Sequence, residues 1–123
     1  MPNILFDPTL QGLSQALTLH QRRHEVLASN LANVETPRFH ARELGFEAAL
    51  KEAFDGRQTD ALAVASAPRV VEDTGAPPRA DGNTVDLDLQ MAKLGANGGR
   101  YVALARILAL RIGLLRHAIE GGR

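Results

Sequence analysis

The sequence predicts an all-α protein in which two long terminal helices pack on each other as a coiled-coil hairpin, joined by an extended, flexible connector. Near both ends of the chain, apolar residues recur at alternating spacings of three and four, the heptad period of helices that wind around each other. Between these segments, residues 55–82 contain three prolines and three glycines without any sustained period. The chain therefore divides into residues 1–54, 55–82 and 83–123.

The first helix is expected to begin at Asp7 and Pro8. Asp is a favoured N-cap, and Pro suits the first helical position because the N–H that it lacks would have no partner there. Pro37 is expected to end the helix, since the residue before a proline is disfavoured in the α region. The predicted seam consists of Leu10, Leu13, Leu17, His20, His24, Leu27, Leu31 and Val34.

A short amphipathic helix is expected over residues 46–54, and Val70-Val71 could form a short strand within the connector. The second long helix is expected to be capped by Asn83, Thr84 and Asp86 and to stop at Gly121. At about 1.5 Å per residue, the two long helices would extend roughly 40 and 50 Å, too far for a small sphere. The seam of the second consists of Leu87, Met91, Leu94, Gly98, Tyr101, Ala105, Leu108, Ile112, Leu115 and Ile119.

The second helix predicts assembly. Fourteen of the twenty residues 101–120 are apolar, including Val102, Leu104, Ile107, Leu110 and Leu114 off the seam. A helix that is apolar nearly all round is buried on several sides, and one partner from the same chain covers only one of them. We therefore expect Leu108 and Leu115 to pack within the chain, and Leu110 and Leu114 to face neighbouring subunits.

Glycines weaken the same helix. Gly95, Gly98 and Gly99 each cost about 1 kcal/mol relative to Ala in a helix interior. With only four Phe, one Tyr and no Trp, the chain has little aromatic surface to offset that loss. We expect the separated chain to be partly disordered and to fold on assembly.

Composition argues against several classes of protein. Lys plus Arg and Asp plus Glu both total 14, so the basic footprint of a nucleic-acid binder is missing. No cysteine is present, and the longest apolar region, residues 101–119, contains three arginines and a histidine, which argues against a membrane span. The first thirty residues lack the pattern of a cleaved signal peptide.

No catalytic, cofactor or metal site is predicted. His20 and His24 are four residues apart and share one helical face, a geometry that can hold a metal. However, Gln21 stands where the zinc-protease pattern requires Glu, and no cysteine ligand exists. Seam or interface histidines are the preferred interpretation.

Residues 28–39 resemble the N-terminal signature of flagellar axial proteins: an Asn-rich helix end with Asn30 and Asn33, then Thr36-Pro37, then the aromatic Phe39. Residues 41–46, and residues 83–88 with Met91 and Arg100-Tyr101, resemble the proximal-rod members of the flagellar basal-body rod protein family. The resemblance covers about residues 10–54 and 83–120.

The sequence departs from the family pattern at two places. Arg38 stands where the family usually has Gly, which would make a left-handed backbone costly there. Gly98 and Gly99 replace better helix formers, which weakens the second helix.

The resemblance implies a structural, non-enzymatic subunit of the proximal rod. Its terminal helices would assemble into a tubular helical array that encloses the export channel and transmits torque. Export would proceed through the flagellar type III apparatus without a cleaved signal peptide, and assembly would take place in the periplasm. The implied partners are other copies, other proximal-rod proteins, the adaptor that joins rod to membrane ring, and the export apparatus.

In this interpretation, Asn30 and Asn33 satisfy the last helix carbonyls or backbone groups across an interface, and Phe39 anchors the turn against helices of the same or a neighbouring subunit. Two alternatives stay open: a soluble helical-hairpin adaptor or export chaperone that binds a partner helix, and, with little support, a His-based metalloenzyme. The residues expected to form assembly contacts are Leu27, Asn30, Leu31, Asn33, Thr36, Pro37, Phe39, Leu87, Met91, Leu94, Tyr101, Leu104, Leu108, Leu110, Leu114 and Leu115.

Overall fold

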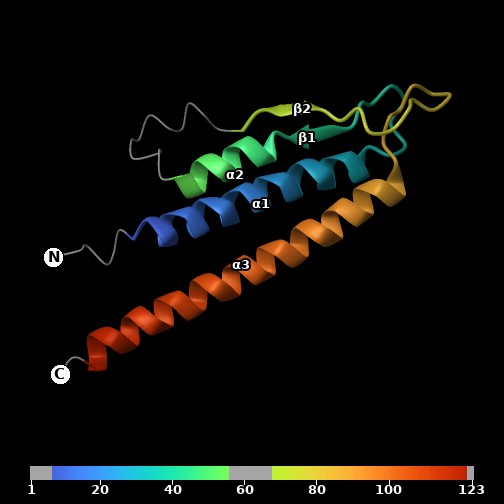
Figure 1. Cartoon of the computed structure of the whole chain (residues 1–123). Helices are drawn as coiled ribbons and strands as arrows, with labels where there is room; N and C mark the ends of the chain where they lie inside the picture. Colours follow the sequence, from blue (N-terminus) through green and yellow to red (C-terminus); the bar gives the residue numbers. More distant parts are fainter. Residues whose placement is uncertain (1–6, 56–67, 122–123) are drawn as a thin grey trace.

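The computed structural model describes residues 7–55 and 68–121. In chain order, the elements are α1 (Pro8–Ala32), β1 (Arg42–Leu44), α2 (Phe46–Asp55), β2 (Val70–Glu72) and α3 (Leu87–Gly121). Helices α1 and α3 run in opposite directions, while α2 and the two strands lie along the other side of α1 (Figure 1). Helix α1 is therefore the central element, and the start of α1 lies at the same end of the molecule as the end of α3 (Figure 1).

The two long terminal helices are confirmed, together with their predicted starts. The Asp7 carboxylate accepts a hydrogen bond of 3.0 Å from the backbone N–H of Thr9, and Pro8 occupies the first turn. The Asp86 carboxylate accepts one of 3.1 Å from the N–H of Leu89. In both cases a side-chain oxygen satisfies a backbone donor that has no partner within the helix.

Helix α1 ends at Ala32, well before Pro37. The backbone N–H of Asn33 donates to the carbonyls of Ser29 and Asn30, which closes the last turn. The chain then turns through residues 33–38 and reaches β1. Val34, predicted on the helical seam, therefore lies in this turn instead.

The prediction of an all-α chain is wrong in one respect, because β1 and β2 form a two-stranded antiparallel sheet. Arg42 lies opposite Glu72, and Leu44 lies opposite Val70. The connector predicted to be flexible is, over residues 68–82, folded against β1 and the start of α3; residues 56–67 lie outside the described part. Strand β1 is not predicted by the sequence, because three residues are too few to show a period of two.

The apolar core lies between α1, α2 and β1, and α3 contributes little to it. Leu19, Leu44 and Phe46 form its centre, with Val26, Ala49 and Leu50 packed against them. Among the described residues of α3, only the polar Gln90 and Asn97 are buried. The fully buried side chains that α3 contributes are thus polar, whereas those of a coiled-coil seam are apolar.

The predicted seams are only partly confirmed. On α1, Leu13, His20 and Leu27 are buried, whereas His24 is exposed. On α3, Leu94, Leu108 and Leu115 are half-buried, but four predicted positions are exposed by between 47% and 64%: Leu87, Met91, Ile112 and Ile119. The helix is rotated from the predicted orientation because Gln90 and Asn97 bond to residues of α1.

The glycines of α3 provide a test of helix stability. A Cβ atom built on Gly95, Gly98 or Gly99 meets nothing within 4 Å. We expect Gly98→Ala and Gly99→Ala each to raise the free energy of unfolding by about 1 kcal/mol, measured by urea titration followed by circular dichroism. The matched control is Gly82→Ala, which should destabilise the chain because Gly82 has φ +81°. Destabilisation by both helix substitutions would show that these glycines serve a close approach.

Within the described ranges, no helix is long and apolar enough to cross a membrane.

Candidate assembly site and the polar junction beneath it

The segment carrying Thr36-Pro37 forms a compact turn at the end of α1. The Asn33 side-chain amide donates to the Ser29 carbonyl at 2.8 Å, as predicted for one of the last helix carbonyls. The Thr36 hydroxyl donates to the Asn33 side-chain oxygen at 3.1 Å, and the Thr36 N–H donates to the Asn33 carbonyl at 3.0 Å. These short-range bonds reverse the chain before β1.

Asn83, which the sequence analysis assigned to the cap of α3, instead clamps this turn. It is fully buried, and its side-chain N–H₂ donates to the carbonyls of Asn33, Val34 and Thr36 at 2.9, 3.2 and 2.8 Å. Its side-chain oxygen accepts from the N–H of Val85 at 2.7 Å. One amide therefore binds three backbone carbonyls of the turn that follows α1.

Thr84 makes the second tie between the turn and the start of α3. Its backbone N–H donates to the Phe39 carbonyl at 3.0 Å, and its hydroxyl accepts from the N–H of Ala41 at 2.8 Å. Of the three predicted capping residues, Asp86 alone caps the helix. The sequence could not reveal the roles of Asn83 and Thr84, because their partners lie more than forty residues away in the chain.

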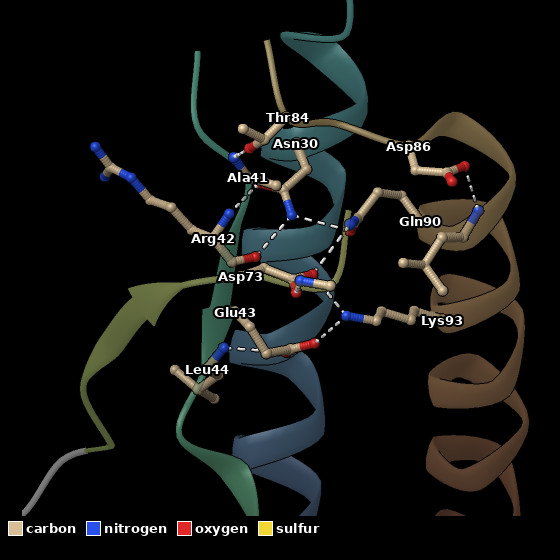
Figure 2. Close-up of polar contacts among 12 residues, drawn as sticks. Asn30, Ala41, Arg42, Glu43, Leu44, Asp73, Thr84, Asp86, Gln90 and Lys93 are labelled. Atoms are coloured by element: carbon tan, nitrogen blue, oxygen red, sulfur yellow. Dashed lines mark hydrogen bonds and ion pairs between the residues drawn. The ribbon is translucent and has the colours of Figure 1, made fainter. Parts of the chain in front are cut away.

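Asn30 connects α1, β1 and α3. It has no exposed surface, and its amide donates to the Arg42 carbonyl at 2.7 Å and to the Gln90 side-chain oxygen at 2.9 Å (Figure 2). Its own side-chain oxygen accepts from the Arg42 N–H at 2.9 Å. Asn30 therefore pairs with backbone groups of a strand of the same chain, and not with the last carbonyls of the helix as one of the predicted roles required.

Charged side chains extend this junction toward the middle of α1. The Glu43 carboxylate of β1 accepts two hydrogen bonds from Arg23 of α1, at 2.9 and 3.1 Å. Lys93 of α3 lies between Glu43, at 3.1 Å, and Asp73 of the loop after β2, at 2.7 Å (Figure 2). Two cations and two carboxylates thus join α1, β1, α3 and the β2 loop with no net charge.

The junction shifts the pKa of its carboxyl groups downward. Burial opposes ionisation of Glu43, but hydrogen bonds from Arg23, the Leu44 N–H and Lys93 outweigh it and lower the pKa. For Asp73, burial is likewise outweighed by hydrogen bonds from Lys93 and the Gly75 N–H, so its pKa is lowered too. The pKa of Lys93 is raised: burial opposes its charge, and the two carboxylates outweigh that effect.

These shifts predict acid sensitivity. Because the folded-state pKa values of Glu43 and Asp73 lie below the ordinary carboxyl values near 4, their stabilisation is complete above that pH and is lost as pH falls through the folded values. The free energy of unfolding should therefore fall as the pH decreases from about 5 to about 3. The Lys93→Met variant should have a lower free energy of unfolding than the unsubstituted chain at pH 6. Its free energy of unfolding should also decrease less as the pH is lowered. An equal slope in both proteins would contradict the prediction.

Arg38 adopts the left-handed backbone that the departure from the family pattern made costly, with φ +61°. Its N–H donates to the Asp81 carbonyl at 3.0 Å, so the conformation is fixed by the loop before α3. Because this region costs a non-glycine residue about 1–2 kcal/mol, Arg38→Gly should stabilise the chain by about 1 kcal/mol in urea unfolding. Arg42→Gly, at an exposed strand position, is the control and should destabilise. A loss of stability in Arg38→Gly would show that the arginine side chain offsets the backbone strain.

The predicted assembly residues fall into three groups by exposure. Leu27 and Asn30 are buried within the chain. The half-buried residues are Leu31, Asn33, Phe39, Leu94, Leu104, Leu108 and Leu115. The exposed residues are Thr36, Pro37, Leu87, Met91, Tyr101, Leu110 and Leu114.

Phe39 follows the turn and comes shortly before β1. It is half-buried and lines a shallow surface groove with strand and turn residues, among them His40, Val70 and Val71. No residue of α1, α2 or α3 lines this groove.

The histidine pair does not form a metal site in the described residues. His20 is buried, and its Nδ1 lies 2.7 Å from the Asn97 side-chain oxygen, whereas His24 is exposed. Across residues 7–55 and 68–121, no group of three or more His, Cys, Asp or Glu side chains could hold a metal ion.

Comparison with known proteins identifies the family. A family model described as flagella basal body rod protein matches residues 10–40. The chain is 30% identical to the flagellar basal body rod protein FlgB of Escherichia coli, over 94% of this chain and 96% of that protein. It is 32% identical to the protein of that name from Aeromonas hydrophila, over 96% and 97% of the two chains, and 29% identical to that of Bacillus subtilis, over 97% and 98%. The chain therefore belongs to the FlgB family of flagellar basal body rod proteins, structural components of the flagellum.

Proposed function

We propose that this rod subunit builds the proximal part of the shaft. Its terminal helices would pack with those of neighbouring copies and other proximal-rod proteins into a tube of coiled coils around the export channel, and so transmit torque. The observation that carries the proposal is the large number of apolar side chains that are exposed on α3 in the single chain. Leu110 is 69% exposed and Leu114 71%, and Val102, Ile107, Ile112 and Ile119 are exposed by between 49% and 64%.

The shape of α3 supports helix packing at this surface. Leu110 and Leu114 border a groove over Ala109 and Gly113 that is almost wholly apolar, with Arg106 at one end. Small residues between larger ones allow the ridge of another helix to approach closely. An apolar surface that runs along a helix for several turns is typical of a protein–protein interface.

The reach of α3 supports contacts beyond the chain itself. Arg111 forms an ion pair of 3.0 Å with Asp7, the residue that caps the start of α1. Residues 112–121 of α3 continue past that point, all of them exposed except the half-buried Leu115. We propose that a neighbouring subunit covers this end, and that these ten residues exchange their amide hydrogens fastest within α3 in the separated chain.

The remaining parts of the proposal concern transport and neighbours. We propose that the chain leaves the cytoplasm through the flagellar type III apparatus without a cleaved signal peptide. It would then assemble in the periplasm beside the adaptor that joins the rod to the membrane ring. The small apolar core supports this route, because a chain held by few buried side chains unfolds readily.

The test is structural and genetic. A strain that lacks the gene for this chain should lose rods and swimming, and complementation with the gene should restore both. Averaged images of basal bodies isolated from the complemented strain should then contain α1 and α3 as ordered density in the part of the rod nearest the membrane ring. Intact rods without the chain, together with its recovery bound to a helix of an exported protein, would instead favour the adaptor or chaperone function.

A further inference from the structure

The apolar residues of α3 do not by themselves determine which face of this helix packs on α1. Exposed apolar side chains such as Met91, Val102, Leu110 and Leu114 lie at positions that point in several directions around the helix. A helix that is apolar nearly all round can pack on a partner through many faces with similar gain. Something other than apolar burial must therefore orient it.

Three polar pairs connect α3 to α1, spread over the whole contact. Near the end of α1, Asn30 bonds to Gln90 at 2.9 Å. In the middle, His20 lies 2.7 Å from Asn97 through its Nδ1, and the Asn97 amide donates to the His20 carbonyl at 2.8 Å. At the start of α1, the Asp7 carboxylate pairs with Arg111 at 3.0 Å.

The Asn30–Gln90 and His20–Asn97 pairs are both buried, and among the described residues no buried side-chain nitrogen or oxygen lacks a hydrogen-bond partner. Asn30, Gln90, Asn97 and His20 are exposed by 2% or less. Because the Asn97 N–H₂ donates to a carbonyl, its oxygen faces His20, so Nδ1 of His20 carries the hydrogen and donates. Buried polar groups are tolerated only while their donors and acceptors are paired.

We infer that the buried pairs Asn30–Gln90 and His20–Asn97 select the face and the register with which α3 docks on α1. If α3 slides by one heptad or rotates, four buried polar side chains lose their partners, whereas the apolar contacts re-form with other leucines. This is the role that a single buried polar residue has in coiled coils, where it fixes register at the expense of stability. The Asp7–Arg111 pair follows the same register but is more exposed, with 25% and 44% of its side chains accessible.

The buried polar pairs also determine which face of α3 is exposed on the outer surface of the chain. The face of α3 that carries Leu110 and Leu114 points away from α1 only while Asn97 and Gln90 point toward it. The polar pairs thereby determine which apolar side chains a neighbour meets. The inference concerns the single chain and goes beyond the proposed rod function, which can fail independently of it.

The experiment measures register directly. The chain contains no cysteine, so Ser14→Cys on α1 and Ala103→Cys on α3, both exposed, can carry a pair of spin labels for pulsed dipolar spectroscopy of the purified full chain. We expect one narrow distance in this background. In the variant that also carries His20→Leu and Asn97→Leu, we expect further distances, since a slip of one heptad moves α3 by about 10 Å.

The matched control places leucines at exposed positions of the same two helices, His24→Leu with Arg100→Leu, and should retain the single distance. A single unchanged distance in the His20→Leu, Asn97→Leu variant, and again after Gln90→Leu is added to it, would overturn the inference, because neither buried pair would then be needed to set the register. A broad distribution in the labelled background would also overturn it, since the pairs would not hold α3 in the chain alone. Loss of helix in the double-leucine variant, seen by circular dichroism, would mean that the pairs supply stability and do not select among packings.

Discussion

Replacing Asn30 with Ala is expected to lower the free energy of unfolding by about 3 kcal/mol. The substitution leaves the Arg42 N–H, the Arg42 carbonyl and the Gln90 side-chain oxygen without their partner. Each buried polar group left unpaired costs about 1–3 kcal/mol. Urea titration followed by circular dichroism measures the effect.

The control is the same substitution three residues along the chain. The Asn33 amide also bonds to a carbonyl, that of Ser29, but in an exposed setting where water can replace it. Asn33→Ala should therefore cost about 1 kcal/mol or less. Equal losses from the two substitutions would contradict the claim that burial of the Asn30 junction is what matters.

Leu114→Glu is expected to abolish rod formation and swimming while leaving the fold and the export of the chain intact. The side chain is 71% exposed in the single chain, so a carboxylate there stays in water until a neighbour covers it. In an apolar interface, the unpaired charge would be strongly unfavourable. Rods are scored by electron microscopy of basal bodies, and export by the amount of chain outside the cytoplasm.

Leu108→Glu serves as the contrasting variant. Leu108 is half-buried in the single chain, so its replacement should lower the unfolding free energy of the separated protein as well as prevent assembly. Leu114→Glu should leave that free energy nearly unchanged. Swimming cells and normal rods with Leu114→Glu would show that α3 is not buried on several sides in the rod.

Local sequence signals predicted the helices well. Asp7 with Pro8, the start of α2 at Phe46, Asp86 before α3 and the end of α3 at Gly121 all depend on interactions within a few residues. Such interactions are encoded in neighbouring letters of the sequence. The left-handed backbone at Arg38, in contrast, is suggested only by the resemblance, because the family usually has Gly at this position.

The polar junction could not be predicted in this way. Gln90 and Asn97 meet partners 60 and 77 residues away, and heptad analysis assigns polar residues to the solvent side. The apolar residues of α3 gave a seam through Leu87 and Met91, which the structure leaves exposed. In a helix that is apolar nearly all round, the few side-chain amides predict the packed face better than the leucines do. A buried polar group restricts the possible packings far more than an additional leucine does.

Asn30 also determines where the small sheet stops. Its side-chain amide binds both the N–H and the carbonyl of Arg42 on the side of β1 away from β2, as the backbone of an adjacent strand would do. An unpaired strand edge is a template for intermolecular pairing and aggregation, and this one is already occupied. The amide therefore excludes growth of a continuous β-ladder through this edge of β1.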